Sequence, residues 1–187
     1  MEICICEVGR VVGGNDARRN YQRGRNTVKA LFIGSIFFGG LLAIAAPSFA
    51  DDSPPAAEQA RKVEALVNNA AALADKQGKA AFAEFRKKDS EWFRGDTYIF
   101  AYDLRGNVLL NPAFPQREGT NVAGQKDATG KPFQDEILEV AATKGSGWVS
   151  YMFPKPGQSE PSQKWTYVKK VTLDGVPGLV ASGFYPE

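Results

Sequence analysis

The apolar residues of this chain change their repeat period near Thr97, and that change constrains the fold more than any other feature. Residues 55–77 are rich in Ala, Glu and Lys, which favour a helix. Within this range apolar residues recur at intervals of three and four, namely Val63, Leu66, Val67, Ala70 and Leu73 or Ala74. The spacing predicts one long helix with a single apolar face.

A second, shorter helix is expected after Gly78, a residue that disfavours helix. This helix carries Phe82 and Phe85 on one side. Residues 89–96 are expected to form a loop that leads into the part of the chain with the other period.

From Thr97 the period becomes two, which is typical of strands. In "TYIFAYD" the rings of Tyr98, Phe100 and Tyr102 share one face, while Ile99 and Ala101 share the other. "LRGN" is a turn and "VLLNP" returns as a second strand, so the two form a hairpin. A long polar connection follows. Then come a helix at about residues 131–144 and three more strands, "GWVSYMFP", "KWTYVKKV" and "GLVASGFY".

This order of elements predicts an α+β fold. The long N-terminal helix packs on one face of a five-stranded antiparallel sheet, and the short helix and the connection cover the other face. The strand "GWVSYMFP" carries rings on both of its sides. Both faces of the sheet are therefore covered, and the face away from the long helix is either core or the wall of a cavity.

Residues 1–50 have the features of an export signal. Six basic residues precede an uncharged, apolar run at residues 30–46, and Ser48-Phe49-Ala50 fits a small-x-small cleavage site. We expect a signal peptide with a basic N-terminal extension, cleaved near Ala50, and a single domain at residues 51–187 that is periplasmic or secreted. The alternative is an uncleaved helix that anchors the protein in the inner membrane, for which residues 30–46 are short.

The composition excludes most catalytic chemistry. The chain has no histidine, and its two cysteines, Cys4 and Cys6, precede the cleavage site. The commonest general base, the thiolate nucleophile and the usual zinc ligands are therefore missing from residues 51–187. Lys and Arg number 23 against 21 Asp and Glu, a balance that argues against nucleic-acid binding. We expect a protein that is not an enzyme and that uses no cofactor or metal.

Four segments together are similar to a known family: "TYIFAYDLRGNVLLNPAFPQREGTNV", "DATGKPF", "KGSGWVSYMFPKPG" and "WTYVKKV" with "GLVASGFY". In order and spacing they resemble the single Cache domain, type 2, of bacterial extracytoplasmic sensors. The resemblance runs from about Ala56 to Tyr185, with a sensor core at about residues 97–185. It implies a PAS-like sheet behind a long helix and a pocket for small organic molecules, often carboxylates. Such domains belong to chemoreceptors and sensor kinases, and some are stand-alone exported proteins.

The resemblance also implies a set of pocket residues. Asn111 stands where the family often has a histidine before proline, so this chain lacks a titratable group there. Lys164 stands three residues before Tyr167, as the family often shows, and is either a solvated strand residue or the partner of a ligand carboxylate. The expected ligand-binding residues are Tyr98, Tyr102, Asn111, Phe133, Trp148, Tyr151, Phe153, Lys164 and Tyr167.

These features favour an extracytoplasmic sensor domain for a small organic acid or related metabolite. It is expected to act in signal transduction or chemotaxis through a partner such as a membrane receptor or a sensor kinase. One alternative is an interaction module that uses a sheet edge or the turn at residues 155–162, with the pocket filled by its own side chains. Another is the same sensor domain retained on the membrane by its N-terminal helix.

Overall fold

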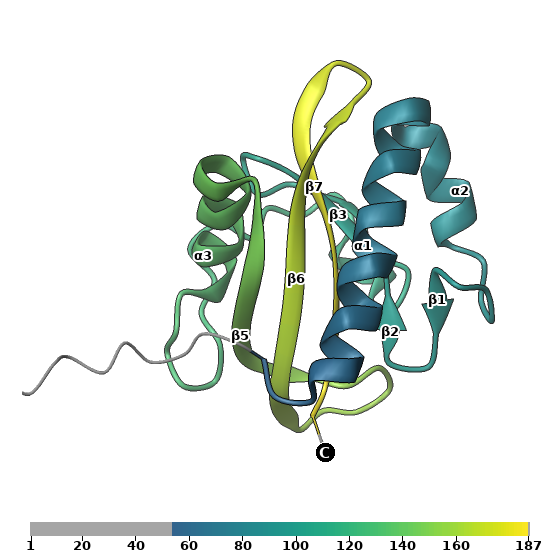
Figure 1. Cartoon of the computed structure of the whole chain (residues 1–187). Coiled ribbons are helices and arrows are strands. Elements are labelled where there is room, and N and C mark those ends of the chain that lie inside the picture. The colour runs from purple at the N-terminus through teal and green to yellow at the C-terminus, as the bar shows by residue number, and fades with distance from the viewer. Residues whose placement is uncertain (1–53, 187) are drawn as a thin grey trace, which may run out of the picture. The chain divides into compact units, whose positions relative to one another are not determined.

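The computed structural model describes residues 54–186, and the expectations for the signal segment lie outside this range. The helical elements are α1 (Ala57–Gln77), the 3-10 turn η1 (Gly78–Ala81), α2 (Phe82–Phe85), the 3-10 turn η2 (Pro115–Arg117), α3 (Phe133–Glu139) and the π-helical turn η3 (Val140–Lys144). The strands are β1 (Phe93–Arg94), β2 (Thr97–Tyr98), β3 (Phe100–Asp103), β4 (Val108–Leu110), β5 (Ser146–Pro154), β6 (Pro161–Leu173) and β7 (Val176–Phe184) (Figure 1).

The main sheet is antiparallel throughout, in the order β4-β3-β7-β6-β5, which confirms the expected five-stranded sheet. β7 lies at its centre, so the last strand of the chain joins the β3–β4 hairpin to the β5–β6 hairpin. The register places Tyr151 opposite Lys164 and Thr166 opposite Gly183. Residues paired in this way point to the same face of a sheet.

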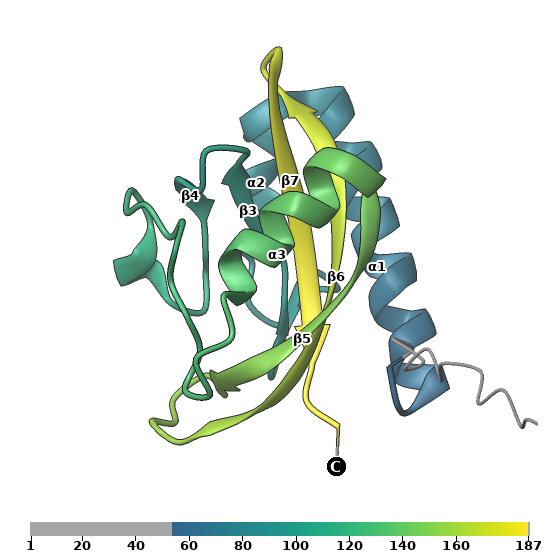
Figure 2. The ribbon, with the colours of Figure 1, turned by 90° about the vertical axis from the view of Figure 1, so that its left-hand side faces the viewer.

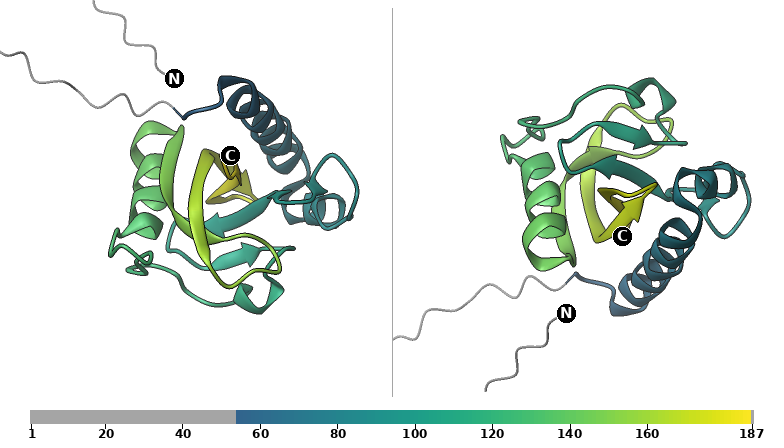
Figure 3. Two further views of the ribbon diagram at one scale, coloured as in Figure 1. Left: turned by 90° about the horizontal axis from the view of Figure 1, so that it is seen from below. Right: turned by 90° about the horizontal axis from the view of Figure 1, so that it is seen from above.

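Helix α1 covers one face of the sheet and packs along β6 and β7, as the views along its axis show (Figure 3). Its buried residues are mostly small: Ala60, Val63, Val67, Ala70, Ala71 and Ala74. The helix ends at Gly78, whose φ of +61° suits glycine and whose N–H donates to the carbonyl of Ala74. A side chain at Gly78 would also collide with Asp174. The expected long helix is confirmed.

The opposite face is covered by α3 and by the connection of residues 113–132 (Figure 2). We call it the ring face, because the sheet presents Phe100, Tyr102, Tyr151 and Phe153 there, and Tyr98 of β2 joins them. On α3, Phe133 and Ile137 complete the apolar cluster. The expected α+β arrangement, with a helix and a loop over this side, is therefore present.

One expectation was wrong. Residues 89–96 do not form only a loop, because β1 pairs with β2 in a separate two-stranded ribbon. Gly95 and Asp96 form the two-residue turn between these strands, and Gly95 has a φ of +58°. A short hairpin of this kind depends on glycine at a positive φ and has too few residues to show an alternating pattern.

Candidate functional site

Lys164, on β6, is a lysine buried on the ring face, only 1% exposed. Its Nζ donates to the Tyr98 hydroxyl at 3.0 Å. The ring centroids of Tyr98, Phe100, Phe153 and Tyr185 lie 4.4, 5.8, 5.5 and 5.3 Å from Nζ, the range in which an aromatic ring attracts a cation. Among the described residues, no carboxylate lies within ion-pairing distance of it. The ammonium therefore meets only neutral groups at close range.

Gly183 makes room for this lysine. A Cβ at this position would lie 2.5 Å from the carbonyl oxygen of Trp165, 2.6 Å from the hydroxyl of Thr166 and 2.9 Å from Cε of Lys164. Its backbone lies within a regular strand, so glycine is needed here for space rather than for conformation. The central strand thus leaves a gap that the lysine side chain crosses.

Burial lowers the pKa of Lys164 to about 7, and the more distant carboxylate of Asp96 opposes this only in part. Near neutral pH the side chain is therefore divided between ammonium and amine. An anion placed next to it would favour the ammonium and raise the pKa again. The site thus has a latent positive charge that a bound anion would strengthen.

The phenols beside Lys164 remain protonated. Burial raises the pKa of Tyr98 well above its ordinary value and also raises the pKa of Tyr151. The Tyr151 hydroxyl shares a hydrogen bond of 2.9 Å with the hydroxyl of Thr166. One ammonium and several hydroxyl groups therefore lie on the same face, a combination of donors that suits a carboxylate.

Aromatic rings from three elements enclose these polar groups. Phe133 of α3 stacks on Tyr151 with centroids 4.2 Å apart. Phe114, on the connection, meets Phe153 edge-on at 5.3 Å and lies 6.1 Å from Tyr98. The ring of Phe114 thus reaches the polar groups from outside the sheet.

Asp127 fastens the connection of residues 113–132 to β5. One carboxylate oxygen accepts from the amides of Thr129 and Lys131 at 2.8 and 3.0 Å and from the Thr129 hydroxyl at 2.6 Å. The other oxygen accepts from the Met152 amide at 2.9 Å. Burial raises the pKa of Asp127, but the hydrogen bonds, led by that from Met152, together outweigh burial and hold the pKa at about 2.

Replacing Asp127 by Asn is expected to lower the free energy of unfolding by about 1–2 kcal/mol at pH 7, because an NH₂ group cannot accept the hydrogen bonds of a carboxylate oxygen. In the wild type the stabilisation by the Asp127 carboxylate is complete above pH 4 and disappears as the pH falls towards 2. The reason is that the pKa of Asp127 is lower in the folded protein than in the unfolded chain. Urea unfolding at pH 7 and pH 3 measures both effects. Glu139→Gln, on the exposed side of α3, is the control. Equal stability of Asp127→Asn and wild type at pH 7 would contradict this role.

Comparison with known families agrees with this architecture. A family model for the Cache domain matches residues 58–174. The chain belongs to the Cache domain family. The resemblance inferred from the sequence is thereby confirmed.

This Cache domain is 30% identical over 92 residues to the methyl-accepting chemotaxis protein McpP of Pseudomonas putida. The match covers 49% of this chain but only 16% of McpP. Among solved structures, a periplasmic sensor domain of a chemotaxis protein is 29% identical with a TM-score of 0.62, covering 71% of this chain and 97% of that one. A Cache chemosensory domain described for carboxylic acid recognition is 26% identical with a TM-score of 0.60, covering 70% and 95%.

The chain is therefore a Cache sensor domain related to the periplasmic domains of chemotaxis receptors, whose family consists of sensors rather than enzymes. Within residues 54–186, no helix combines the length and the apolar character needed to cross a membrane.

The Cache fold brings most of the expected ligand residues together. Six of them lie on the ring face: Tyr98, Tyr102, Phe133, Tyr151, Phe153 and Lys164. Asn111 is 3% exposed, but its side-chain oxygen accepts from the Phe114 amide at 3.1 Å. This bond closes the turn at the start of the connection, so the Asn111 oxygen already has a partner within the protein.

Trp148 and Tyr167 are not part of this group. Both pack in the core beneath α1, with their ring centroids 5.1 Å apart. Tyr167 follows Lys164 by three positions and Trp148 precedes Tyr151 by three, and an odd separation in a strand puts side chains on opposite faces. The sheet therefore separates these two rings from Lys164.

Several residues that contact the group were not among the expected ligand residues. Thr166 is two positions from Lys164, so the period of two could have identified it. Phe100 shares the face of Tyr98, as its alternation predicts, but was not among the expected ligand residues. Tyr185 follows the end of β7, and Arg117 lies in the connection, 5.6 Å from the ring of Phe153. Tyr185 lies within the expected strand "GLVASGFY" and continues its alternation two positions after Gly183, whereas no periodic pattern extends to Arg117.

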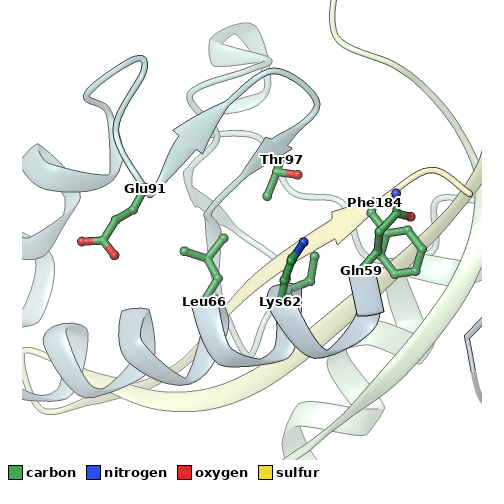
Figure 4. Close-up of a pocket in the computed structure, with 7 residues that line it drawn as sticks. Gln59, Lys62, Leu66, Glu91, Thr97 and Phe184 are labelled. Carbon is green, nitrogen blue, oxygen red and sulfur yellow. The ribbon is translucent and has the colours of Figure 1, made fainter. Parts of the chain in front are cut away.

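A cavity of about 310 Å³ lies elsewhere, between α1 and the segment that carries β1 and β2 (Figure 4). It is lined by Gln59, Lys62, Val63, Leu66, Glu91, Thr97 and Phe184. None of the expected ligand residues contributes to it. Its charged groups, Lys62 and Glu91, are of opposite sign and lie at the protein surface, unlike the buried cation of the ring face.

Proposed function

We propose that this Cache domain binds a small organic acid on its ring face, with the ligand carboxylate paired to the Lys164 ammonium. The observation that carries the proposal is a lysine that is 1% exposed and has no carboxylate partner among the described residues. Burying a charge without an opposite charge beside it costs several kcal/mol. A buried lysine without such a partner therefore suits a site where an anionic ligand supplies the opposite charge. The structural relative described for carboxylic acid recognition supports the same ligand class.

The energetics are sufficient for this role. Hydrogen bonds that involve a charged group contribute about 1.5–3 kcal/mol each. A ligand carboxylate has two oxygens, and Lys164, Tyr98 and Tyr151 offer donors on one face. Together with burial of the ligand's carbon chain against the surrounding rings, such bonds reach micromolar affinity, which corresponds to about 8 kcal/mol.

The biological setting that we propose is outside the cytoplasm. Its relatives sense ligands in the periplasm, and the apolar run at residues 30–46 fits either an export signal or an anchor. In both cases a partner, such as a chemoreceptor or a sensor kinase, recognises the ligand-bound form of the domain. Intact-mass measurement of protein from its host distinguishes a cleaved export signal from a retained anchor, because a chain that starts at Asp51 no longer contains residues 30–46.

A protein-interaction module is the second candidate, and one observation favours it. The rings of the ring face pack against one another, as in the stack of Phe133 on Tyr151 at 4.2 Å. A ligand must displace some of these contacts, such as those of Phe114 on the connection. If the rings never separate, the exposed turn at residues 157–161 becomes the more reasonable contact surface.

Thermal unfolding with matched pairs of small molecules tests the proposal. Acetate, propionate, pyruvate, lactate and succinate are compared with their neutral amides at the same concentration. A ligand at 100 times its dissociation constant should add about 2.7 kcal/mol, roughly 10 °C for a domain of this size. We expect at least one acid to reach this shift while its amide does not. If no acid stabilises the protein, or if acid and amide do so equally, the carboxylate proposal fails.

A further inference from the structure

Arg117 is a second cation beside the ring face. It ends η2, is half-buried, and its Nη2 donates to the side chain of Gln125 at 3.0 Å. Its Nε is buried without a hydrogen-bond partner, and no carboxylate within residues 54–186 lies at ion-pairing distance. A guanidinium normally meets a carboxylate or a phosphate in a bidentate arrangement, and this one meets neither.

Gln134 gives a second, independent observation at the same place. Its side chain is 1% exposed, and its amide oxygen has no hydrogen-bond partner among the described residues. Gln134 and Arg117 both lie close enough to the Tyr102 phenol to lower its pKa, although burial outweighs them and raises it overall. Arg117, Gln134 and Tyr102 therefore form one polar group, which we call the Arg117 cluster. Unsatisfied buried polar atoms are costly, so this end of the ring face suits a polar guest.

The two cations face the same aromatic ring. The Arg117 guanidinium carbon lies 5.6 Å from the centroid of Phe153, and the Lys164 Nζ lies 5.5 Å from it. The two charged centres are thus no farther apart than the sum of these distances. A ligand with one carboxylate neutralises one of them, whereas a ligand with two carboxylates neutralises both.

We infer that the ring face is selective for dicarboxylates of about four carbons, with one carboxylate at Lys164 and the other at the Arg117 cluster. This inference rests on the proposed function and adds the ligand class. Each charge-assisted hydrogen bond takes up about 2.8 Å, so two such bonds and a four-carbon chain together are about as long as this upper limit. Arg117 is then the residue that determines specificity, because it distinguishes a dicarboxylate from a monocarboxylate of the same length.

Calorimetric titration of the full chain with succinate and butyrate at pH 6.5 tests the inference, since both acids have four carbons and differ in one carboxylate. We expect succinate to bind at least 30-fold more tightly than butyrate to the wild type. Arg117→Leu should reduce that ratio to less than threefold and change butyrate affinity by less than twofold. Arg105→Leu, which removes the same charge from an exposed turn, should preserve the wild-type ratio.

The outcomes separate the inference from the function it rests on. If butyrate binds as tightly as succinate, or if Arg117→Leu weakens both acids alike, the dicarboxylate inference is overturned while carboxylate binding stands. If neither acid binds and no other acid stabilises the wild type, both fail. Arg117→Gln, which keeps hydrogen bonding to Gln125 possible, repeats the test should Arg117→Leu unfold at a lower temperature than the wild type.

Discussion

Replacing Lys164 by Met is expected to stabilise the unliganded protein while weakening carboxylate binding about 100-fold. Methionine is close to lysine in volume and suits the apolar surroundings of the ring face. The wild-type protein has to bury an amine whose charged form is disfavoured, and the substitution removes that cost. The same substitution removes the cation that the ligand carboxylate pairs with, which corresponds to about 3 kcal/mol of binding free energy.

The gain in stability should depend on pH in a defined direction. The folded pKa of Lys164, about 7, lies below the ordinary value of 10.5, so the unfolded chain binds one more proton between these values. The penalty in the wild type is therefore complete below pH 7 and absent above about pH 10.5. Allowing for the lost hydrogen bond to Tyr98, Lys164→Met should be more stable by about 3 kcal/mol at pH 6, roughly 10 °C in Tm.

Circular dichroism melts at pH 6 and pH 10 and calorimetric titration at pH 6 measure both effects. Lys170→Met is the matched control, because Lys170 is an exposed lysine on the same strand. It should change neither stability nor affinity appreciably. A Lys164→Met protein that is less stable than wild type at pH 6, or one that binds the acid as tightly, would show that Lys164 has a structural role instead.

The fold could be predicted from the sequence because apolar residues recur at regular intervals within its long helices and strands. The stripe of Val63, Val67 and Ala70 predicted α1, and the alternation of Tyr98, Phe100 and Tyr102 predicted their shared face. The ribbon of β1 and β2 was missed, since two strands of two residues contain no period. Periodicity is thus informative in proportion to the length of an element.

The site was predicted less completely, for two physical reasons. Trp148 and Tyr167 were grouped with Lys164 by resemblance, although strand alternation places them on the α1 side. Arg117 and Gln134 reach the ring face from a connection and from the start of α3, whose positions are set by tertiary contacts such as the bonds of Asp127. Such contacts leave no regular pattern in the sequence.

Raising the pH from 6.5 to 8.5 is expected to weaken carboxylate binding by roughly 25-fold, because only the protonated form of Lys164 attracts the ligand. Small organic acids stay ionised over this range, so the change comes from the protein. The neighbouring phenols do not contribute, since burial raises the pKa of Tyr98 and of Tyr185. Asp96 favours the charged lysine but is outweighed by burial.

Proton uptake provides the decisive measurement. A bound carboxylate raises the pKa of Lys164 above its unliganded value of about 7, so at pH 8 each ligand should bring about 0.9 proton with it, and at pH 6 about 0.1. Titration calorimetry in two buffers of different ionisation enthalpy gives this number directly. Residual binding to Lys164→Met should take up no proton and keep a constant affinity between pH 6.5 and 8.5. Wild-type affinity that is equally constant would mean that the ligand does not pair with the Lys164 ammonium, and the carboxylate site would then have to be sought elsewhere on the domain.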